Sequence, residues 1–306
     1  MTSPMLLRTA YHLAALLALP PLLLGIVNRT KAVFAGRAGP PLVQPYLDLW
    51  KLVRKGAVYS RTTTWVFRAG PVVGLAAVAT AGLLLAMGGA PAAISFAGDF
   101  VLFAYLLGLA RFATALAALD TGSAFEGMGA AREVTFSSLA EPALFLVLLV
   151  LARATGSLSL GGMLGPQLGA AWGGAAPALL LAAISLFVVA LAENARIPVD
   201  DPNTHLELTM IHEVMVLDHG GPDLALIQYG AALKLFLFGA ILSRLVLPAG
   251  SGALASEALF LGGLLAFAVG VGVVESVMAR LRMPRVPQLL VGASVLSAFA
   301  LVLLLR

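Results

Sequence analysis

Long apolar stretches recur along the chain, and polar and charged residues gather in the segments between them. A helix needs about 20 mainly apolar residues to cross the hydrocarbon core of a bilayer. No clear small-residue cleavage site follows the first apolar stretch, so we expect that stretch to be retained as a helix. The pattern predicts an all-α integral membrane protein with a single membrane domain over residues 1–306. The eight predicted spans cover residues 5–27, 70–88, 99–119, 137–155, 176–193, 226–247, 257–279 and 287–305.

Composition excludes the soluble classes of protein. Of the 306 residues, 60% are hydrophobic and only 11% are charged, whereas a soluble domain carries about 25% charged residues. The chain has no cysteine, so it cannot supply thiolate ligands to zinc or to an iron–sulfur cluster. Any electron-transfer chemistry that the protein serves must therefore lie in a partner.

The positive charges are distributed unevenly between the loops, which predicts the orientation of the chain. Thirteen of the 19 Lys and Arg residues fall in the first, third, fifth and seventh loops, and the second, fourth and sixth loops have none. The positive-inside rule places the charged loops in the cytoplasm and both termini outside. Because topology accounts for these charges, we expect no nucleic-acid binding. The cytoplasmic loops cover residues 28–69, 120–136, 194–225 and 280–286.

The first cytoplasmic loop contains a predicted interfacial helix. After Pro45, apolar residues such as Leu47 and Trp50 alternate with charged ones, which on a helix gives an apolar face with a basic rim. Two interpretations stay open: the helix anchors the chain on anionic lipid, or its cations also dock a soluble partner. The cations that would dock the partner are Arg37, Lys51, Arg54 and Lys55.

Acidic residues concentrate in the third cytoplasmic segment, where seven of the 15 fall between Glu193 and Asp223. Glu193 and Arg196 are one helical turn apart, so we expect them to pair at the membrane boundary. Pro198 ends the helix, and the turn after it is expected to start a helix over 203–217.

Three interpretations of this segment stay open. It is a solvated acidic loop, a metal site, or a proton path in which carboxylates and imidazoles have pKa values moved by burial and by Arg196. His212 and Glu213 lack the second histidine of an H-E-x-x-H motif, and no third ligand is evident. We therefore expect no metal.

Ionisable residues inside the predicted spans favour the proton path, because a charge in hydrocarbon costs about 3 kcal/mol or more. The alternative is that these side chains reach the interface, which we expect of Glu275 beside Arg280 and of Arg153 and Arg244 near the outer surface. The candidates for a proton path are Arg111, Glu141, Glu193, Arg196, Asp200, Asp201, His205, Glu207, His212, Glu213, Lys234 and Glu275.

Three segments of the chain resemble a family of membrane subunits. They are GRAGPPLVQPYLDLWKL (36–52), AREVTFSSLAEP (131–142) and AENARIPVDDPNTHLELTMIHE (192–213). The family comprises subunit 1 of respiratory complex I and its counterparts in membrane-bound nickel–iron hydrogenases. His205 and the sequence TMIHE (209–213) are most similar to the formate hydrogenlyase and hydrogenase-4 branch.

The resemblance implies a membrane-anchoring and energy-coupling role. In this family the subunit docks a hydrophilic redox arm and links its chemistry to ion-translocating, antiporter-like membrane subunits. Hydrogenase large and small subunits and iron–sulfur subunits are the expected partners, and they would hold the nickel–iron centre and the clusters. We expect no cofactor in this chain and a location in a prokaryotic cytoplasmic membrane.

The resemblance also assigns residues by position. The polar-path positions are Glu141, Glu193, Arg196, Asp200 and Glu207. The docking positions are Gln44, Asp48, Lys51 and Arg132. Three alternatives to the coupling role stay open: a quinone-chamber subunit of a complex I-like oxidoreductase, a passive anchor without an ion path, and an independent transporter.

Overall fold

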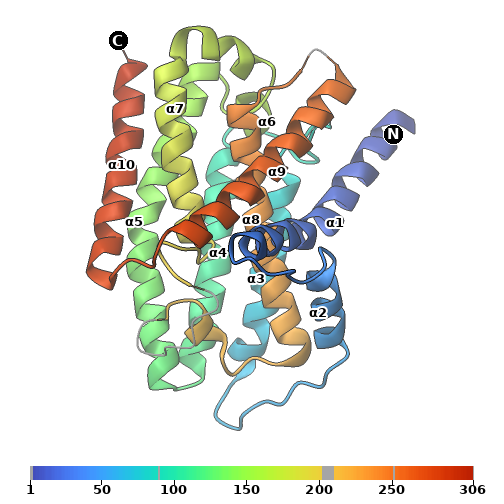
Figure 1. The fold of residues 1–306 in the computed structure, drawn as a ribbon, viewed down its shortest axis with the longest axis vertical. Helices are drawn as coiled ribbons and strands as arrows, with labels where there is room; N and C mark the ends of the chain where they lie inside the picture. Colours follow the sequence, from blue (N-terminus) through green and yellow to red (C-terminus); the bar gives the residue numbers. More distant parts are fainter. Residues whose placement is uncertain (1–2, 89, 202–209, 251, 306) are drawn as a thin grey trace.

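The computed structural model describes residues 3–88, 90–201, 210–250 and 252–305 of the chain, and the described part is almost wholly helical (Figure 1). Eight of its helices are long and apolar enough to cross a membrane, so the predicted all-α membrane fold is confirmed. They are α1 (Ser3–Phe34), α3 (Trp65–Leu83), α4 (Asp99–Asp120), α5 (Ala124–Thr155), α7 (Gln167–Glu193), α8 (Gly221–Val246), α9 (Ala253–Val277) and α10 (Val286–Leu303). The short elements are α2 (Gln44–Val53), α6 (Leu160–Met163) and the 3-10 turns η1 (Glu213–Val216) and η2 (Met283–Arg285).

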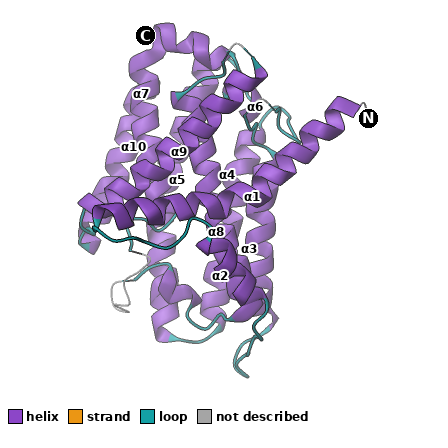
Figure 2. Ribbon diagram, turned by 45° about the vertical axis from the view of Figure 1, so that its right-hand side comes forward, coloured by secondary structure: helices purple, strands orange, loops and turns teal. Residues whose placement is uncertain are grey.

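Helix α8 lies at the centre of the bundle, where it packs against α1, α2, α3, α7 and α9. Helices α5, α7 and α10 pack together on one side, and α3 packs along α4 on the other. Helices α1 and α9 contact each other and run obliquely across the other spans (Figure 2). The core contains large apolar side chains with no exposed surface, among them Phe103, Phe236, Phe238 and Phe260.

The start of helix α3 is fixed by polar caps that the sequence supplies. Asp120, at the end of α4, accepts hydrogen bonds from the backbone N–H of Thr64 at 2.6 Å and of Phe67 at 3.2 Å. The Thr64 side chain accepts another from Val66 N–H. Because the first N–H groups of a helix have no partner within it, these acceptors define where α3 begins and join it to α4.

Two long helices extend beyond the predicted spans, because polar residues ended the apolar pattern without ending the helix. Helix α5 begins at Ala124, so most of the predicted cytoplasmic loop 120–136 is helical. Helix α1 continues to Phe34, which brings Lys31 into its last turn. Residues of this kind, alanine, glutamate and arginine, favour helix whether or not the surroundings are apolar.

The expected helix over 203–217 is wrong for the part that the structure describes. Only Glu213–Val216 is helical there, as a 3-10 turn. The backbone N–H groups of Ile211 and His212 donate instead to the Asp200 carboxylate, at 3.2 and 3.1 Å. These bonds fold the chain back onto the turn at residue 200. Residues 202–209, with His205 and Glu207, lie outside the described residues.

The predicted interfacial helix is present as α2, which buries none of its residues. Its Tyr46 hydroxyl donates to the carbonyl of Ala18 on α1. Trp50, Leu47 and Val53 stay exposed on its surface. The helix is therefore amphipathic and peripheral, as the pattern predicted.

Candidate functional site

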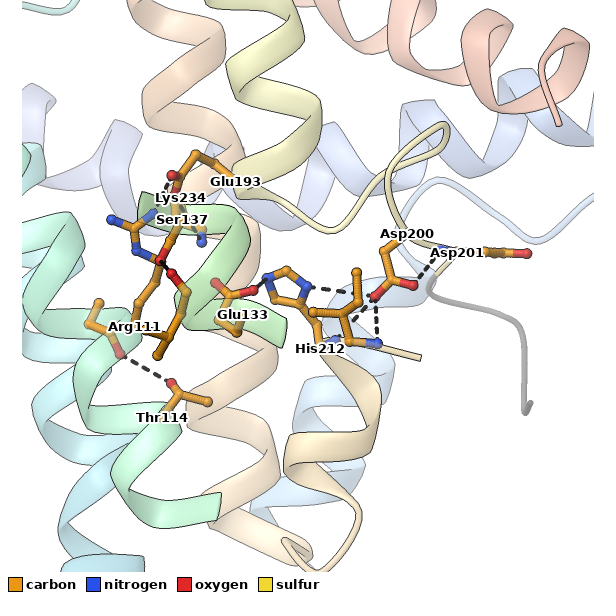
Figure 3. Close-up of polar contacts among 12 residues, drawn as sticks. Arg111, Thr114, Glu133, Ser137, Glu193, Asp200, Asp201, His212 and Lys234 are labelled. Carbon is orange, nitrogen blue, oxygen red and sulfur yellow. Dashed lines mark hydrogen bonds and ion pairs between the residues drawn. The ribbon is translucent and has the colours of Figure 1, made fainter. Parts of the chain in front are cut away.

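Arg111, in the middle of α4, connects three helices. Its Nη1 pairs with the Glu193 carboxylate at the last residue of α7, and its Nη2 lies 2.5 Å from Glu141 Oε1 on α5. The Arg111 and Glu193 side chains are only 9% and 2% exposed. Arg111 and Glu193 therefore form a buried ion pair (Figure 3). Glu141, whose side chain is 48% exposed, joins this group through Arg111.

Glu193 also faces a second cation. Lys234 Nζ on α8 lies 3.7 Å from Glu193 Oε2, on the side away from Arg111. The attraction of two cations offsets part of the cost of burying the Glu193 carboxylate. This position allows Glu193 to exchange partners if either cation moves.

A second row of charges runs from α5 to the loop before η1. Glu133 Oε2 on α5 lies 3.1 Å from His212 Nε2, and His212 Nδ1 lies 3.7 Å from Asp200 Oδ2. Asp200 Oδ1 pairs in turn with Arg280 Nη2 at 2.9 Å. Figure 3 shows Glu133, His212 and Asp200 in line beside the Arg111 group.

The charge state of His212 follows from this position between two acids. Burial disfavours the imidazolium, but the Glu133 charge and the contacts with Asp200 and Glu133 outweigh it and raise the pKa of His212 to about 9. His212 is therefore protonated at neutral pH. A cation links the two acidic side chains and can lose its proton when either of them changes charge.

A third group lies where α1 and α9 meet the loop after α7. The Glu275 side chain has no exposed surface and pairs with Lys31 Nζ at 2.7 Å and Arg196 Nη1 at 3.0 Å. The expected Glu193–Arg196 pair is therefore wrong, because α7 ends at Glu193 and the chain then turns Arg196 toward α9. The alternative that Glu275 reaches the interface beside Arg280 is also wrong.

A cavity of about 530 Å³ adjoins the Arg111 group, between α3, α4, α8 and the segment after α7. Its walls are mainly apolar, and its charged residues gather at one end. The charged and polar residues in its lining are Arg111, Glu133, Glu193, Asn194, Arg196, His212, Glu213, His219, Gln228 and Lys234. The arrangement can hold water or an amphipathic molecule against a set of interacting charges.

The remaining predicted path residues lie at the edges of this arrangement. Glu213 lines the cavity, and the backbone N–H of Asp201 donates to Asp200 Oδ1. Arg244, expected to reach the outer surface, is only 5% exposed and lies with its guanidinium 5.8 Å from the Phe260 ring. That expectation is wrong, because the oblique α9 covers the last turn of α8. Arg153 is exposed.

The predicted docking residues divide into two sets. Arg37, Lys51, Arg54 and Lys55 are exposed, and Arg54 stacks on Trp50 at 5.1 Å. Gln44 donates to Asp48 within α2. Arg132 is half-buried and donates to the carbonyl of Met210, so within this chain it holds the loop before η1 against α5.

Sequence patterns missed three residues of the site. Glu133 and Lys31 were assigned to loops, because the polar residues around them interrupted the apolar pattern. His219 follows the acidic segment, and a single histidine carries no sequence pattern that indicates a site. Residues that favour helix continue beyond the apolar parts of α1 and α5. If the predicted helices are extended through these residues, Lys31 and Glu133 lie beside the embedded charges.

Comparison with known proteins gives a consistent result. The profile of a family described as NADH dehydrogenase matches residues 7–306. The chain is 34% identical to hydrogenase-4 component C of Escherichia coli K12 over 77% of this chain and 73% of that protein. It is 30% identical to formate hydrogenlyase subunit 4 of the same organism over 90% of both chains.

A solved structure shares the fold. It is the membrane-bound sulfane sulfur reductase, an archaeal respiratory membrane complex, of which one chain superposes with a TM-score of 0.84. The match covers 98% of this chain and 99% of that one, at 22% identity. At this identity the likeness concerns the fold alone.

Proposed function

Because the chain belongs to the NADH dehydrogenase family of membrane subunits, the type of complex I subunit 1, we propose that it couples redox chemistry to ion movement in a membrane-bound nickel–iron hydrogenase of the formate hydrogenlyase type. It is a membrane subunit of complex I-like hydrogenase or oxidoreductase complexes. The finer assignment is supported by the two Escherichia coli relatives, which are named as hydrogenase and formate hydrogenlyase components.

One observation carries the coupling role: Arg111 lies buried between Glu193 and Glu141 inside membrane-spanning helices. A passive anchor has no need of such charges, each of which is costly in hydrocarbon. Because Glu193 contacts both Arg111 and Lys234, a change in the position or charge of one cation alters the interaction of Glu193 with the other. The group thus offers a route by which events at the cytoplasmic side reach the membrane interior.

Glu141 is the point at which this route leaves the chain. Its side chain is 48% exposed, although it lies well inside the spanning helix α5. Contact between lipid hydrocarbon and a half-exposed carboxylate is energetically unfavourable. In our proposal an antiporter-like subunit covers this face of α4 and α5. A change at Glu141 then drives the movement of a proton or a sodium ion in that subunit.

The cytoplasmic surface would dock the hydrophilic arm. Arg37, Lys51, Arg54 and Lys55 give it an exposed basic rim, and Trp50 adds an apolar contact on α2. The hydrogenase large and small subunits and the iron–sulfur subunits would bind here and carry the nickel–iron centre and the clusters. The proposed location is a prokaryotic cytoplasmic membrane, with both termini outside.

A second candidate function is the quinone-chamber subunit of a complex I-like oxidoreductase. The observation that favours it is the cavity of about 530 Å³, which has mainly apolar walls and a charged end. Cavities of this size and polarity suit an amphipathic ligand. The hydrogenase assignment requires no such ligand.

Gentle solubilisation of the tagged chain from its own cells, followed by mass spectrometry and two assays, distinguishes these functions. Nickel–iron hydrogenase subunits with hydrogen evolution and no quinone reduction would support the first proposal. Quinone reduction without hydrogenase subunits would replace it with the second. A chain that purifies alone would contradict both.

A further inference from the structure

The cavity beside α8 has two chemically different ends. Its lining follows α8 from His219, just before the helix, to Lys234. At 1.5 Å per residue, these positions lie roughly 20 Å apart along the axis. Gly70 and Gly74 of α3 line the middle, where no ionisable side chain contributes from that helix. The cavity therefore joins a single buried histidine to the Glu193–Lys234 pair.

His219 is held at its end of the cavity by an aromatic contact. Its ring stacks on Phe67 of α3 with centroids 3.9 Å apart and an interplanar angle of 6°. The residue is only 5% exposed. Tyr59 meets the Phe67 ring edge-on, and Arg68 lies 4.2 Å from the Tyr59 ring. The stack fixes the plane of the imidazole beside the loops at the cytoplasmic side.

The charge state of His219 suits proton transfer. Burial lowers the pKa of His219, against the opposing effects of Asp223 and Asp218, which are the acids that face it. The ring is therefore neutral at pH 7, with one nitrogen to donate and one to accept. His212, by contrast, is protonated at this pH while Glu133 and Asp200 are charged.

Polar atoms among the residues of the cavity wall indicate that the cavity contains water. Asn194 Oδ1, Arg196 Nε and His219 Nδ1 are buried and have no hydrogen-bond partner among the described residues. Water is stable in a cavity where it finds several polar partners, and the charged and polar side chains of this lining offer them. At about 30 Å³ per molecule, the cavity has room for on the order of ten waters.

We propose that this cavity is a hydrated proton-uptake path, in which His219 receives protons from the cytoplasm and passes them along water to the Glu193–Lys234 pair. One ring nitrogen accepts a proton from the cytoplasmic side, and the other releases one into the cavity. The relay leaves the proton on the opposite nitrogen, and a half-turn of the ring about Cβ–Cγ restores the first tautomer. The net charge does not change, so no redox partner is needed. The path rests on the proposed coupling function and specifies where its protons enter.

The water content of the cavity can be measured without any activity assay. Because the chain has no cysteine, a single cysteine can report its own surroundings in the assembled complex. Ala231 lines the cavity, and Ala240, nine residues further along α8, is buried among apolar side chains. In inside-out vesicles, we expect a cationic methanethiosulfonate to label Ala231→Cys at least about tenfold faster than Ala240→Cys, because hydrated positions alone form the reactive thiolate. Equal rates would overturn the proposal, as would protection of Ala231→Cys by added quinone.

The role of His219 is tested by proton uptake per hydrogen evolved. His219→Phe keeps a ring to stack on Phe67 but carries no proton, so uptake should fall by about tenfold or more. Proton uptake should fall as far in His219→Ala and should recover when imidazole is added. The recovered uptake should then depend on pH according to the pKa of the added base. His12→Ala is the control, because His12 is a buried histidine that does not line the cavity and contacts the carbonyl of Gly82 at 3.1 Å.

The outcomes separate this inference from the proposed function. A wild-type complex that moves no ions would contradict the coupling function itself. A wild-type complex that moves protons, together with a His219→Phe variant that moves them equally fast, would overturn the path alone. Loss in the His219→Ala variant without recovery in imidazole would assign His219 a purely structural role and also overturn it.

Discussion

The two ends of the helix bundle use buried charges in different ways. At the end that we propose faces the cytoplasm, called the cytoplasmic end below, Glu193 pairs with both Arg111 and Lys234 across three helices, and these residues border a cavity. At the outer end, the Asp99 carboxylate accepts backbone N–H groups, and the Tyr11 hydroxyl donates to Glu257. The first arrangement can change partners. The second completes hydrogen bonds that the fold itself requires.

An apolar layer separates these two regions. On α8 between Lys234 and Arg244, the side chains of Phe236, Phe238 and Ile241 have no exposed surface. Charge moving straight through this layer would lose its solvation, which is costly in a dry interior. In our proposal, coupling therefore runs sideways from the cytoplasmic end through the half-exposed Glu141, and the outer end contributes to stability.

The largest effect should separate the two buried arginines. Arg111→Ala leaves Glu193 and Glu141 without their shared cation, and removal of one partner of a buried ion pair costs about 3–5 kcal/mol. Arg244→Ala should cost much less, because its Nε and Nη1 have no hydrogen-bond partner among the described residues. Thermal denaturation of the purified complexes measures both. Equal losses of stability would remove the distinction between the two ends.

The next effect is a pH dependence that belongs to the cytoplasmic end. The pKa of His212 is about 9 in the folded chain, against 6.5 for an unperturbed histidine. Its contribution to stability is therefore complete below pH 6.5 and is lost as pH rises through 9, by roughly 3 kcal/mol at most. Melting temperatures from pH 6 to pH 10 should fall more steeply for the wild type than for His212→Gln. Parallel curves would show that His212 is not held protonated.

A smaller effect on stability is expected at Asp99, where we expect a substitution to lower stability and leave function unchanged. Asp99 is fully buried and accepts hydrogen bonds from Leu160 N–H at 2.6 Å and Phe96 N–H at 3.2 Å. The two bonds use different carboxylate oxygens, so Asp99→Asn keeps one acceptor but places its NH2 donor against the other backbone N–H, at a cost of about 2 kcal/mol. Calorimetry should detect the loss, while hydrogen evolution and ion movement stay at the wild-type level. Reduced ion movement would give the outer end a functional role.

The smallest effect is expected for Tyr11→Phe. This variant removes only the hydroxyl that donates to Glu257, and such a hydrogen bond contributes about 1 kcal/mol or less. We expect a slightly lower melting temperature and unchanged ion movement, measured in the same vesicles as the wild type. A loss of ion movement larger than the loss of stability would extend the path to the outer side.

The number of spans could be predicted from sequence, because each apolar stretch is long enough to cross a bilayer. The ion-pair partners could not, since they depend on how helices distant in sequence meet. Glu193 and Arg196 illustrate this limit: their spacing favours a pair, yet α7 ends between them and each finds a partner on another helix. Glu275, on α9, has no exposed surface because α1 crosses α9 beside it and Lys31 and Arg196 cover its carboxylate.

In our proposal, ion movement passes through Glu141 and not through the outer end. Proton uptake per hydrogen evolved, measured in inside-out vesicles, should fall strongly in Glu141→Gln and stay unchanged in Glu257→Gln, a carboxylate on another spanning helix. Both variants should assemble with their partners, because each substitution keeps the size of the side chain. Wild-type ion movement in Glu141→Gln, or an equal loss in both variants, would contradict the account.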